Sequence, residues 1–228
     1  MHILITSAAS ATAHVIADSL ADNHMIRLTD LSHNADGEMI ANDLDHGRLT
    51  DDLVSGVDAI INIGFEGQTG TDTHLMDYHT RCAYNLLYAA AGAGVSRFIN
   101  ISTLRLYENH EENLVVTERW RTDPSAEDVA ILGAHMTEVV CKEFARDRLI
   151  DVVNLRFGWP FVETVLPDSS HTAITTHGLV AATVAESLLS DQLAPWQDVH
   201  VQSPVKHQRF ITTTAARIFP NLADRLAL

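Results

Sequence analysis

The sequence predicts an α/β fold in which a doubly wound parallel sheet carries a small C-terminal subdomain. Short β-branched runs alternate with helical stretches over about the first 160 residues, and this order is typical of parallel sheets. The strand runs are largely apolar, as in strands that are buried on both faces. Hydrophobic residues make up 46% of the 228 residues, which is enough to bury a substantial core.

The elements follow one another in a regular order from the N-terminus. Residues 2–6 form the first expected strand, a helix follows over about 8–21, and the second strand, 25–29, closes on Asp30. Strands and helices alternate after this βαβ unit, at about 38–41, 47–54, 58–63, 73–93, 97–102, 126–146 and 151–156. Four apolar runs are expected at the centre of the sheet: Ile3 to Thr6, Ile60 to Ile63, Phe98 to Ile101 and Val152 to Leu155.

The alternation loosens after Gly158-Trp159-Pro160. The rest of the chain predicts one helix over about 179–190, a strand-like run at 200–202 and a short terminal helical piece. This tail is too small for an independent core. We therefore expect residues 1–160 to form the main domain and residues 161–228 to form a reduced subdomain packed on the same core.

The composition narrows the classes of partner. Fifteen basic and thirty acidic residues give a net charge of −15, which repels nucleic acid and anionic membrane surfaces. Cys82 and Cys141 are isolated and form no disulfide framework, as expected in a reducing compartment. The chain also has no leader-like segment and no apolar run of membrane-spanning length. We expect a cytoplasmic protein that binds neither nucleic acid nor membrane.

A strand, a turn of small residues and a helix N-terminus follow one another at residues 6–13. Backbone N–H groups in such a turn can bind a phosphate, and a glycine-rich version binds the pyrophosphate of a dinucleotide. Here Ser7, Ser10 and Ala13 occupy the three glycine places, and the turn contains no glycine. The order of elements predicts a phosphate site, and the two serines predict a crowded one.

Several segments together resemble the extended short-chain dehydrogenase/reductases, the NAD-dependent epimerase/dehydratase group. The resemblance covers most of residues 1–160, and its order and spacing are more specific than any single piece. The segments that carry it are 1–6, 27–31, 42–44, 85–90, 94–98, 101–103, 106–107, 116–118 with Pro124, and 155–158. It implies a Rossmann-like, dinucleotide-binding domain over residues 1–160.

The resemblance also implies where NAD would be held. Asp30 would accept the hydroxyls of the adenosine ribose and repel the 2′-phosphate of NADP, and the pair Asp43 and Leu44 would contact the adenine edge. The remaining cofactor-binding positions are Ser7, Ser10, Ala11, Ile63 and Gly64. Because Ser7 and Ser10 crowd the pyrophosphate, we expect NAD to be bound weakly, as a vestigial ligand.

The catalytic pair of the family is missing. In the family a Tyr lies four residues before a Lys, and the resemblance places Leu132 and Met136 at these positions. Residues 122–141 contain neither Tyr nor Lys, and none of the four tyrosines is followed by Lys four residues later. Thr103 lies at the family's substrate-polarising hydroxyl position. Tyr107, one loop from Thr103, and His135, beside Met136, are the titratable residues expected to replace the lost phenol as acid and base.

Two functions are therefore predicted. The first is a catalytically degenerate protein, a pseudoenzyme that binds a nucleotide-like small molecule or serves as a scaffold. The second is an active NAD-dependent oxidoreductase, epimerase or dehydratase that acts on a sugar-like substrate through Tyr107 or His135. A subunit that acts only through protein interactions and binds no nucleotide is a third possibility.

Metal binding and association complete the expectations. The densest set of possible metal ligands, Asp72, His74, Asp77 and His79, lacks the spacing of a metal motif, so no metal is expected. The helices at 73–93 and 126–146 carry more apolar residues than one sheet face needs, and this predicts a homodimer through them. The residues concerned are Leu75, Tyr84, Leu87, Ile131, Val139 and Val140.

Overall fold

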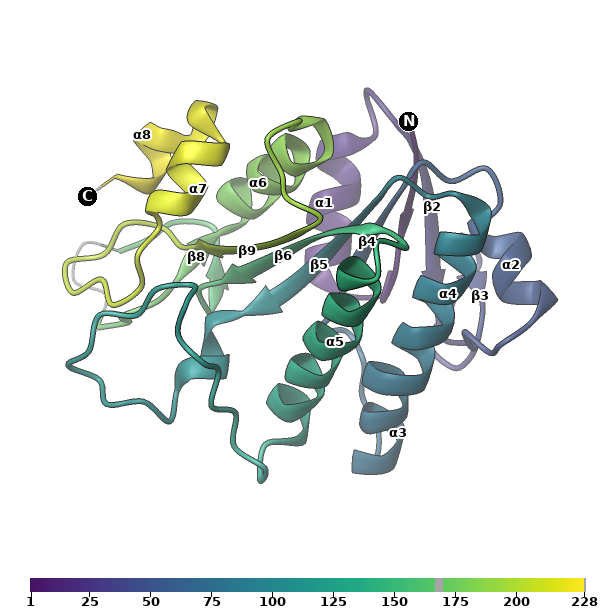
Figure 1. The fold of residues 1–228 in the computed structure, drawn as a ribbon, viewed down its shortest axis with the longest axis horizontal. Coiled ribbons are helices and arrows are strands. Elements are labelled where there is room, and N and C mark those ends of the chain that lie inside the picture. The colour runs from purple at the N-terminus through teal and green to yellow at the C-terminus, as the bar shows by residue number, and fades with distance from the viewer. Residues whose placement is uncertain (167–169, 228) are drawn as a thin grey trace.

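The protein contains a seven-stranded sheet in which every strand pair is parallel, as the sequence predicts. A computed structural model describes residues 1–166 and 170–227. The strands lie in the order β3-β2-β1-β4-β5-β6-β9 (Figure 1). Their bounds are β1 His2–Ile5, β2 Met25–Asp30, β3 Ile40–Ala41, β4 Ala59–Ile63, β5 Arg97–Thr103, β6 Asp151–Phe157 and β9 Trp196–Val201. The four strands expected at the centre, β1, β4, β5 and β6, lie there.

Helices cover both faces of the sheet (Figure 1). On one face α1 (Ala11–Leu20) packs against α6 (His177–Leu189), and on the other α2 (Arg48–Val54) packs against α4 (Ala83–Ala93), which in turn contacts α5 (Val129–Arg146). Three shorter helices are α3 (Asp72–Asp77), α7 (Thr213–Ile218) and α8 (Ala223–Leu226). None of the helices in the described part of the chain is long and apolar enough to cross a bilayer.

Successive strand residues face opposite sides of the sheet and fill two separate cores. Ile3 and Ile5 of β1 belong to the cluster that includes residues of α1 and α6, whereas Leu4 belongs to the cluster that includes residues of α2 and α4. This period of two is the geometry of a strand. Because both faces are covered, the central strands are apolar at most positions, which explains the largely apolar runs of the sequence.

Some elements differ in extent from the expectation. The helix expected over 73–93 consists of α3, a π-helical turn at Tyr78–Cys82 and α4. Helix α1 begins at Ala11 because the Ser10 hydroxyl caps it, and α5 begins at Val129 because the Asp128 carboxylate caps it. A two-stranded parallel sheet, β7 (Phe161–Val162) with β8 (Thr175–Thr176), was not expected.

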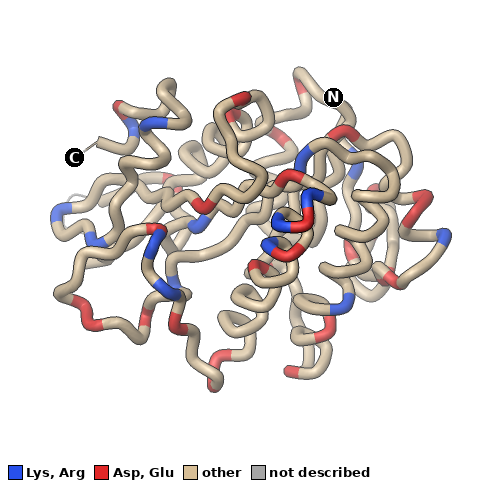
Figure 2. Tube along the Cα trace, viewed as in Figure 1, with Lys and Arg blue, Asp and Glu red and all other residues tan. Residues whose placement is uncertain are grey.

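The C-terminal residues contribute directly to the main sheet. The strand-like run expected at 200–202 is the end of β9, which pairs with β6 along six residues of each strand. The terminal helical piece is α7, a 3₁₀ turn at Pro220–Leu222 and α8. Lys and Arg are distributed over several elements and interspersed with Asp and Glu (Figure 2).

A row of polar side chains crosses the sheet in register. Asn62, Asn100 and Asn154 are paired partners on β4, β5 and β6. The Thr6 hydroxyl donates to Asn62 Oδ1 at 3.0 Å, and each asparagine amide then donates to the next side chain, at 2.9, 2.9 and 2.8 Å, the last bond ending on Asp198 Oδ1 of β9. All three asparagines are buried. Each therefore depends on its neighbours for hydrogen bonds, since it is shielded from solvent.

The substitution Asn100→Ala is expected to lower the free energy of unfolding by about 3 kcal/mol, because it removes the acceptor of Asn62 and the donor to Asn154 in the buried sheet. Urea denaturation measures this change. The matched control Asn109→Ala lies on an exposed loop and should shift stability by less than about 0.5 kcal/mol. Equal effects of the two variants would contradict the stabilising role of the amide row.

Candidate functional site

The turn after β1 lies at the carboxyl ends of the parallel strands, which is where dinucleotide sites form in this class of fold. Ser7 is buried and has a φ of 45°, in the left-handed region that favours glycine. Its hydroxyl lies 2.7 Å from the hydroxyl of Tyr78. Burial raises the pKa of Tyr78 to about 12, although its hydrogen bonds to Ser7 and Thr6 oppose the rise. The Ser7 hydroxyl, at the first glycine place, is therefore already hydrogen-bonded to a side chain of the protein.

The N-terminus of α1 is also occupied by groups of the chain. Ser10 Oγ accepts a hydrogen bond from Ala13 N at 3.1 Å. The Thr12 hydroxyl and backbone N–H act on the carboxylate of Glu66; burial raises the pKa of Glu66, and these two contacts partly offset the rise. Glu66 Oε1 is buried and has no hydrogen-bond partner among residues 1–166 and 170–227. Ala11, the first residue of the helix, is exposed.

Asp30 is buried at the end of β2, and both of its oxygens accept hydrogen bonds from the chain. Ala9 N donates to Oδ2 at 2.9 Å, and Leu31 N donates to Oδ1 at 2.8 Å. The third donor is Gln68 Nε2, 2.8 Å from Oδ1. Only 3% of the residue is exposed, and Oδ1 already accepts two hydrogen bonds, so a ribose hydroxyl could bond to Oδ1 only by replacing one of these two donors.

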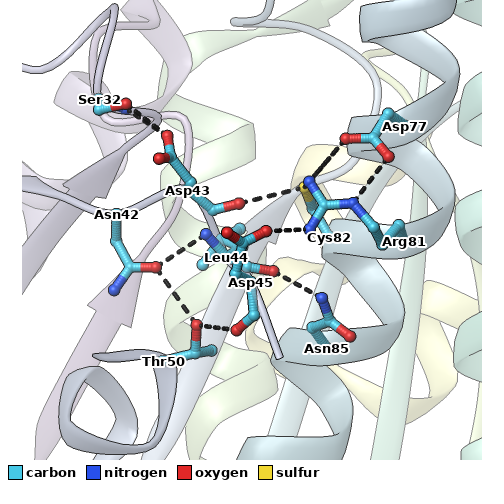
Figure 3. Close-up of polar contacts among 10 residues, drawn as sticks. All are labelled: Ser32, Asn42, Asp43, Leu44, Asp45, Thr50, Asp77, Arg81, Cys82 and Asn85. Carbon is cyan, nitrogen blue, oxygen red and sulfur yellow. Dashed lines mark hydrogen bonds and ion pairs between the residues drawn. The ribbon is translucent and has the colours of Figure 1, made fainter. Parts of the chain in front are cut away.

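The predicted adenine-edge residues lie in a hydrogen-bonded cluster on the loop before α2 (Figure 3). The Asp43 carboxylate accepts from the Ser32 hydroxyl, and Leu44 N donates to Asn42 Oδ1 at 2.8 Å. Asn85 Nδ2 of α4 donates to the Leu44 carbonyl at 2.8 Å. These bonds hold Leu44 at a φ of 50°. The loop is therefore fixed in position, and the backbone N–H and carbonyl of Leu44 already have hydrogen-bond partners within the chain.

Arg81 joins this loop to the helix region at 72–93 (Figure 3). Its guanidinium forms a two-pronged pair with Asp77, at 2.8 and 2.7 Å, and also contacts Asp45. The hydrogen bonds from Arg81 lower the pKa of Asp77. All three side chains are substantially exposed, so the contacts position the loop more than they stabilise the fold.

Ile63 and Gly64 end β4 beside the turn. Ile63 N donates to the Thr6 hydroxyl at 3.0 Å, and Gly64 N donates to the Ile101 carbonyl at 2.8 Å. A Cβ on residue 64 would lie 2.3 Å from Asn100 Oδ1. Only glycine fits at this place, because the amide row of the sheet passes directly beside it.

On the substrate side, Thr103 and Tyr107 are both completely buried. The Thr103 hydroxyl accepts from Arg105 N at 3.2 Å and caps the 3₁₀ turn Leu104–Tyr107. Arg156 Nη1 donates to the Tyr107 hydroxyl at 2.6 Å, and His200 Nε2 lies 3.3 Å from the same oxygen. Burial raises the pKa of Tyr107 despite the opposing charge of Arg156. Neither side chain is open to a substrate in this conformation.

A buried ion pair beneath these residues was not found by sequence reasoning. Arg156 of β6 and Glu138 of α5 form two hydrogen bonds, at 2.9 and 2.6 Å, and the Ser102 hydroxyl donates to Glu138 at 2.6 Å. Burial alone would raise the pKa of Glu138, but the charge and hydrogen bonds of Arg156, together with hydrogen bonds from Ser102 and Asn154, lower it. The available signal was the presence of charged residues within an apolar strand and on the inner face of a helix.

His135 lies apart from Thr103 and is half-buried. Its Nδ1 is 3.1 Å from the Thr122 hydroxyl, and burial lowers its pKa. It lines a cavity of about 100 Å³ together with Lys142 and Arg156. Arg156 thus lies beside both candidate acids: it donates a hydrogen bond to Tyr107, and it lines the same cavity as His135. Leu132 and Met136, on the same helix, are also half-buried.

Within residues 1–166 and 170–227, no group of three His, Cys, Asp or Glu side chains is placed to hold a metal ion. Of the four residues considered for a metal, His79 is buried and its Nδ1 lies 3.1 Å from the Thr137 hydroxyl. Burial lowers the pKa of His79 to about 4. His74 packs edge-on against His33, with ring centres 4.7 Å apart.

The chain matches the model of the NAD dependent epimerase/dehydratase family over residues 3–201. No curated protein matches its sequence. The structure is similar to uronate dehydrogenase from Agrobacterium tumefaciens, with a TM-score of 0.83 and 16% identity over 95% of this chain and 82% of that one. Glucuronic acid dehydrogenase from Chromohalobacter salexigens gives a TM-score of 0.80 and 18% identity over 99% and 88%. MoeE5 in complex with UDP-glucuronic acid and NAD gives 0.75 and 13% over 96% and 93%.

The Arg156–Glu138 pair predicts a specific pH dependence of stability. Because the folded protein holds the pKa of Glu138 below its ordinary value of 4.5, the ionised carboxylate stabilises the fold above that pH, and this contribution is lost as the pH falls further. Glu138→Gln should lower the free energy of unfolding at pH 7 by about 3 kcal/mol and flatten its decline between about pH 5 and pH 3. The matched control Glu127→Gln is exposed. If Glu138→Gln retained the same slope as this control, the pairing would be refuted.

Proposed function

Because the chain belongs to the NAD-dependent epimerase/dehydratase family, we propose that it is a catalytically degenerate member, a pseudoenzyme that serves as a nucleotide-binding or scaffolding protein. One observation carries the proposal. The resemblance assigns Leu132 and Met136 of α5 to the places of the family's Tyr and Lys, and residues 122–141 contain neither a Tyr nor a Lys. Neither side chain can transfer a proton or hold the nicotinamide ribose with a charge.

The surroundings of the possible replacements support the same proposal. A phenol that exchanges protons near neutral pH needs a lowered pKa, whereas burial raises the pKa of Tyr107. Its hydroxyl is engaged by Arg156, and Thr103 is completely buried. Both therefore serve the packing and hydrogen bonding of the fold.

The alternative is an active NAD-dependent oxidoreductase, epimerase or dehydratase with His135 or Tyr107 as acid and base. Its support is the cavity beside His135, where Lys142 supplies a positive charge and Arg156 is paired with Glu138. Two structural neighbours are named as dehydrogenases of uronic acids. A sugar acid or a nucleotide sugar is accordingly the substrate class to test for this alternative.

We propose NAD rather than NADP as the dinucleotide, bound weakly. A second negative charge beside the buried Asp30 carboxylate is unfavourable, and this disfavours the 2′-phosphate of NADP. Ser7 at a φ of 45° and Ser10 at the N-terminus of α1 narrow the pyrophosphate turn. We also propose a cytoplasmic location, on the composition alone.

A homodimer through α4 and α5 is a further part of the proposal. Tyr84, Tyr88 and Val139 are 47%, 52% and 40% exposed, and the two tyrosine rings stack with centres 6.1 Å apart. Leu87 and Ile131, which the sequence also offered for this surface, belong instead to the core. The apolar surface is therefore narrower than expected.

Purified protein is expected to show no turnover of NAD or NADH with uronates, nucleotide sugars or simple alcohols and ketones above a protein-free blank, because the proton-transferring pair is absent. The double variant Leu132→Tyr, Met136→Lys restores the pair. At saturating NAD it should exceed the matched variant Leu132→Phe, Met136→Gln, which resembles it in size but lacks the hydroxyl and the charge. General acid–base catalysis contributes about 10²- to 10⁴-fold.

Wild-type turnover that His135→Ala or Tyr107→Phe abolishes, with NAD affinity unchanged, would reject the pseudoenzyme and establish the alternative enzyme. The comparison of affinities is essential, because loss of binding alone would not identify an acid or base.

The dimer is tested by light scattering at micromolar concentrations. The wild type should have twice the mass of one chain, and Tyr84→Glu with Val139→Glu should reduce it to one, because two charges would be buried at the interface. The control Leu189→Glu changes another exposed apolar residue and should remain dimeric. A monomeric wild type would refute this association.

A further inference from the structure

Four consecutive residues, Phe65 to Gln68, follow β4 and lie along the groups that would hold a dinucleotide. We refer to them as the 65–68 segment. Each residue contacts a different part of the site: the loop after β6, the N-terminus of α1, the turn after β1 and the acid at the end of β2. Each of these contacts can be compared with the part of NAD that would bind at the same place.

Gly67 lies directly on the pyrophosphate turn. Its φ is 90°, and a Cβ at this position would lie 2.7 Å from Ser7 Cβ and 2.9 Å from Ser10 Cβ. Ser7 and Ser10 are the residues at the first two glycine places, where the backbone approaches a bound pyrophosphate. Gly67 fills the space next to both of them, and a larger residue would not fit there.

Glu66 places a negative charge at the N-terminus of α1. This is the position where a helix stabilises a phosphate, through unpaired N–H groups and the helix dipole. The carboxylate contacts the Thr12 hydroxyl and backbone N–H, and the N–H of Ala13 is taken by Ser10. An acid of the chain thus stands where the anion of a ligand would bind.

Gln68 donates a hydrogen bond to Asp30, the acid predicted to bind the ribose. Its Nε2 donates to Asp30 at 2.8 Å and to Ser7 Oγ at 3.2 Å. Asn34 Nδ2 donates to Gln68 Oε1 at 3.0 Å and fixes the orientation of the amide. A ribose hydroxyl would donate to the same Asp30 carboxylate. Since Oδ1 already accepts from Leu31 N and Gln68 Nε2, Gln68 and a ribose hydroxyl compete for that oxygen.

Phe65 attaches the start of the segment to the residues that follow β6. Its ring packs edge-on against Trp159 and Phe161, with ring centres 5.5 and 5.8 Å apart. Only 8% of Phe65 is exposed. The segment is therefore held at both ends, by aromatic packing at residue 65 and by amide hydrogen bonds at residue 68.

As folded, these residues do not fit NAD. We propose that the 65–68 segment fills the place where NAD would lie, between the turn after β1, the N-terminus of α1 and Asp30. We call this place the dinucleotide groove, and the segment must leave it before NAD can bind. This rests on the proposed weak retention of NAD and supplies its physical cause. When only a fraction of molecules has an open groove, the apparent affinity falls by that fraction.

The contacts of Glu66 explain why the segment can be displaced. Burial raises the pKa of this carboxyl, and its Oε1 has no hydrogen-bond partner in the part of the chain that the structure describes. An ionised carboxylate in this environment is unfavourable compared with the same group in water. A pyrophosphate, with two charges and more acceptor oxygens, would use the N–H groups of α1 better, and Glu66 would return to solvent.

Titration calorimetry with NAD tests the proposal on four single variants and the wild type. Gln68→Ala removes the competing donor, and Glu66→Gln removes the competing charge at nearly constant size. Each should lower the dissociation constant for NAD about tenfold, the change expected for the loss of one charge-assisted hydrogen bond. The matched controls Gln192→Ala and Asp72→Asn, both exposed, should match the wild type. Asp72→Asn also removes one negative charge close in sequence, so it controls for net charge.

Unchanged or weaker NAD binding in both Gln68→Ala and Glu66→Gln would overturn the proposal, as would equal gains in the controls. Hydrogen exchange gives a second readout on the wild type: NAD near saturation should raise exchange at the amides of residues 65–68, because the segment has moved into solvent. Unchanged or slower exchange there would also overturn it. Turnover of a substrate would reject the pseudoenzyme but leave these two measurements decisive for the segment.

Discussion

The structure depends on one constraint: polar side chains placed inside an apolar parallel sheet must find their partners within the chain. The row from Thr6 through Asn62, Asn100 and Asn154 to Asp198 satisfies it by pairing strand with strand in register. Asp198 lies 3.1 Å from Arg156, which extends the row to Glu138 on α5 and to Tyr107. The buried network therefore connects the turn after β1 with the substrate side of the sheet, and a change at one member leaves its neighbours unpaired.

The same constraint bears on the site. At the substrate end, Thr103, Tyr107 and Arg156 hydrogen-bond within the chain, and at the cofactor end Asp30, Leu44 and the N-terminus of α1 do the same. In an enzyme of this fold such groups are kept for the substrate and the dinucleotide. Here they are used for internal contacts, and this supports the proposal that the chain does not carry out the chemistry of an enzyme of this fold.

Sequence reasoning reached the fold because the fold follows from local signals. Apolar runs such as Ile60 to Ile63 indicate strands that are covered on both faces, and the absence of Tyr and Lys in residues 122–141 can be read directly. The contacts of the 65–68 segment could not be predicted from the sequence. They join Gln68 to Asp30 and Gly67 to Ser7, residues far apart in the sequence, and no local pattern encodes them. The same is true of the pair of Glu138 and Arg156, because the two charges come from different elements, α5 and β6, and meet only in the folded chain.

The most direct test of the account is the mass of the protein as purified. Native mass spectrometry of the freshly prepared chain, followed by the ultraviolet spectrum of whatever denaturation releases, shows whether a dinucleotide is carried. A groove filled by residues 65–68 predicts the mass of the polypeptide alone, as monomer or dimer, and no absorbance from released nucleotide. One NAD retained per chain through gel filtration would contradict both the filled groove and the weak binding on which the account rests.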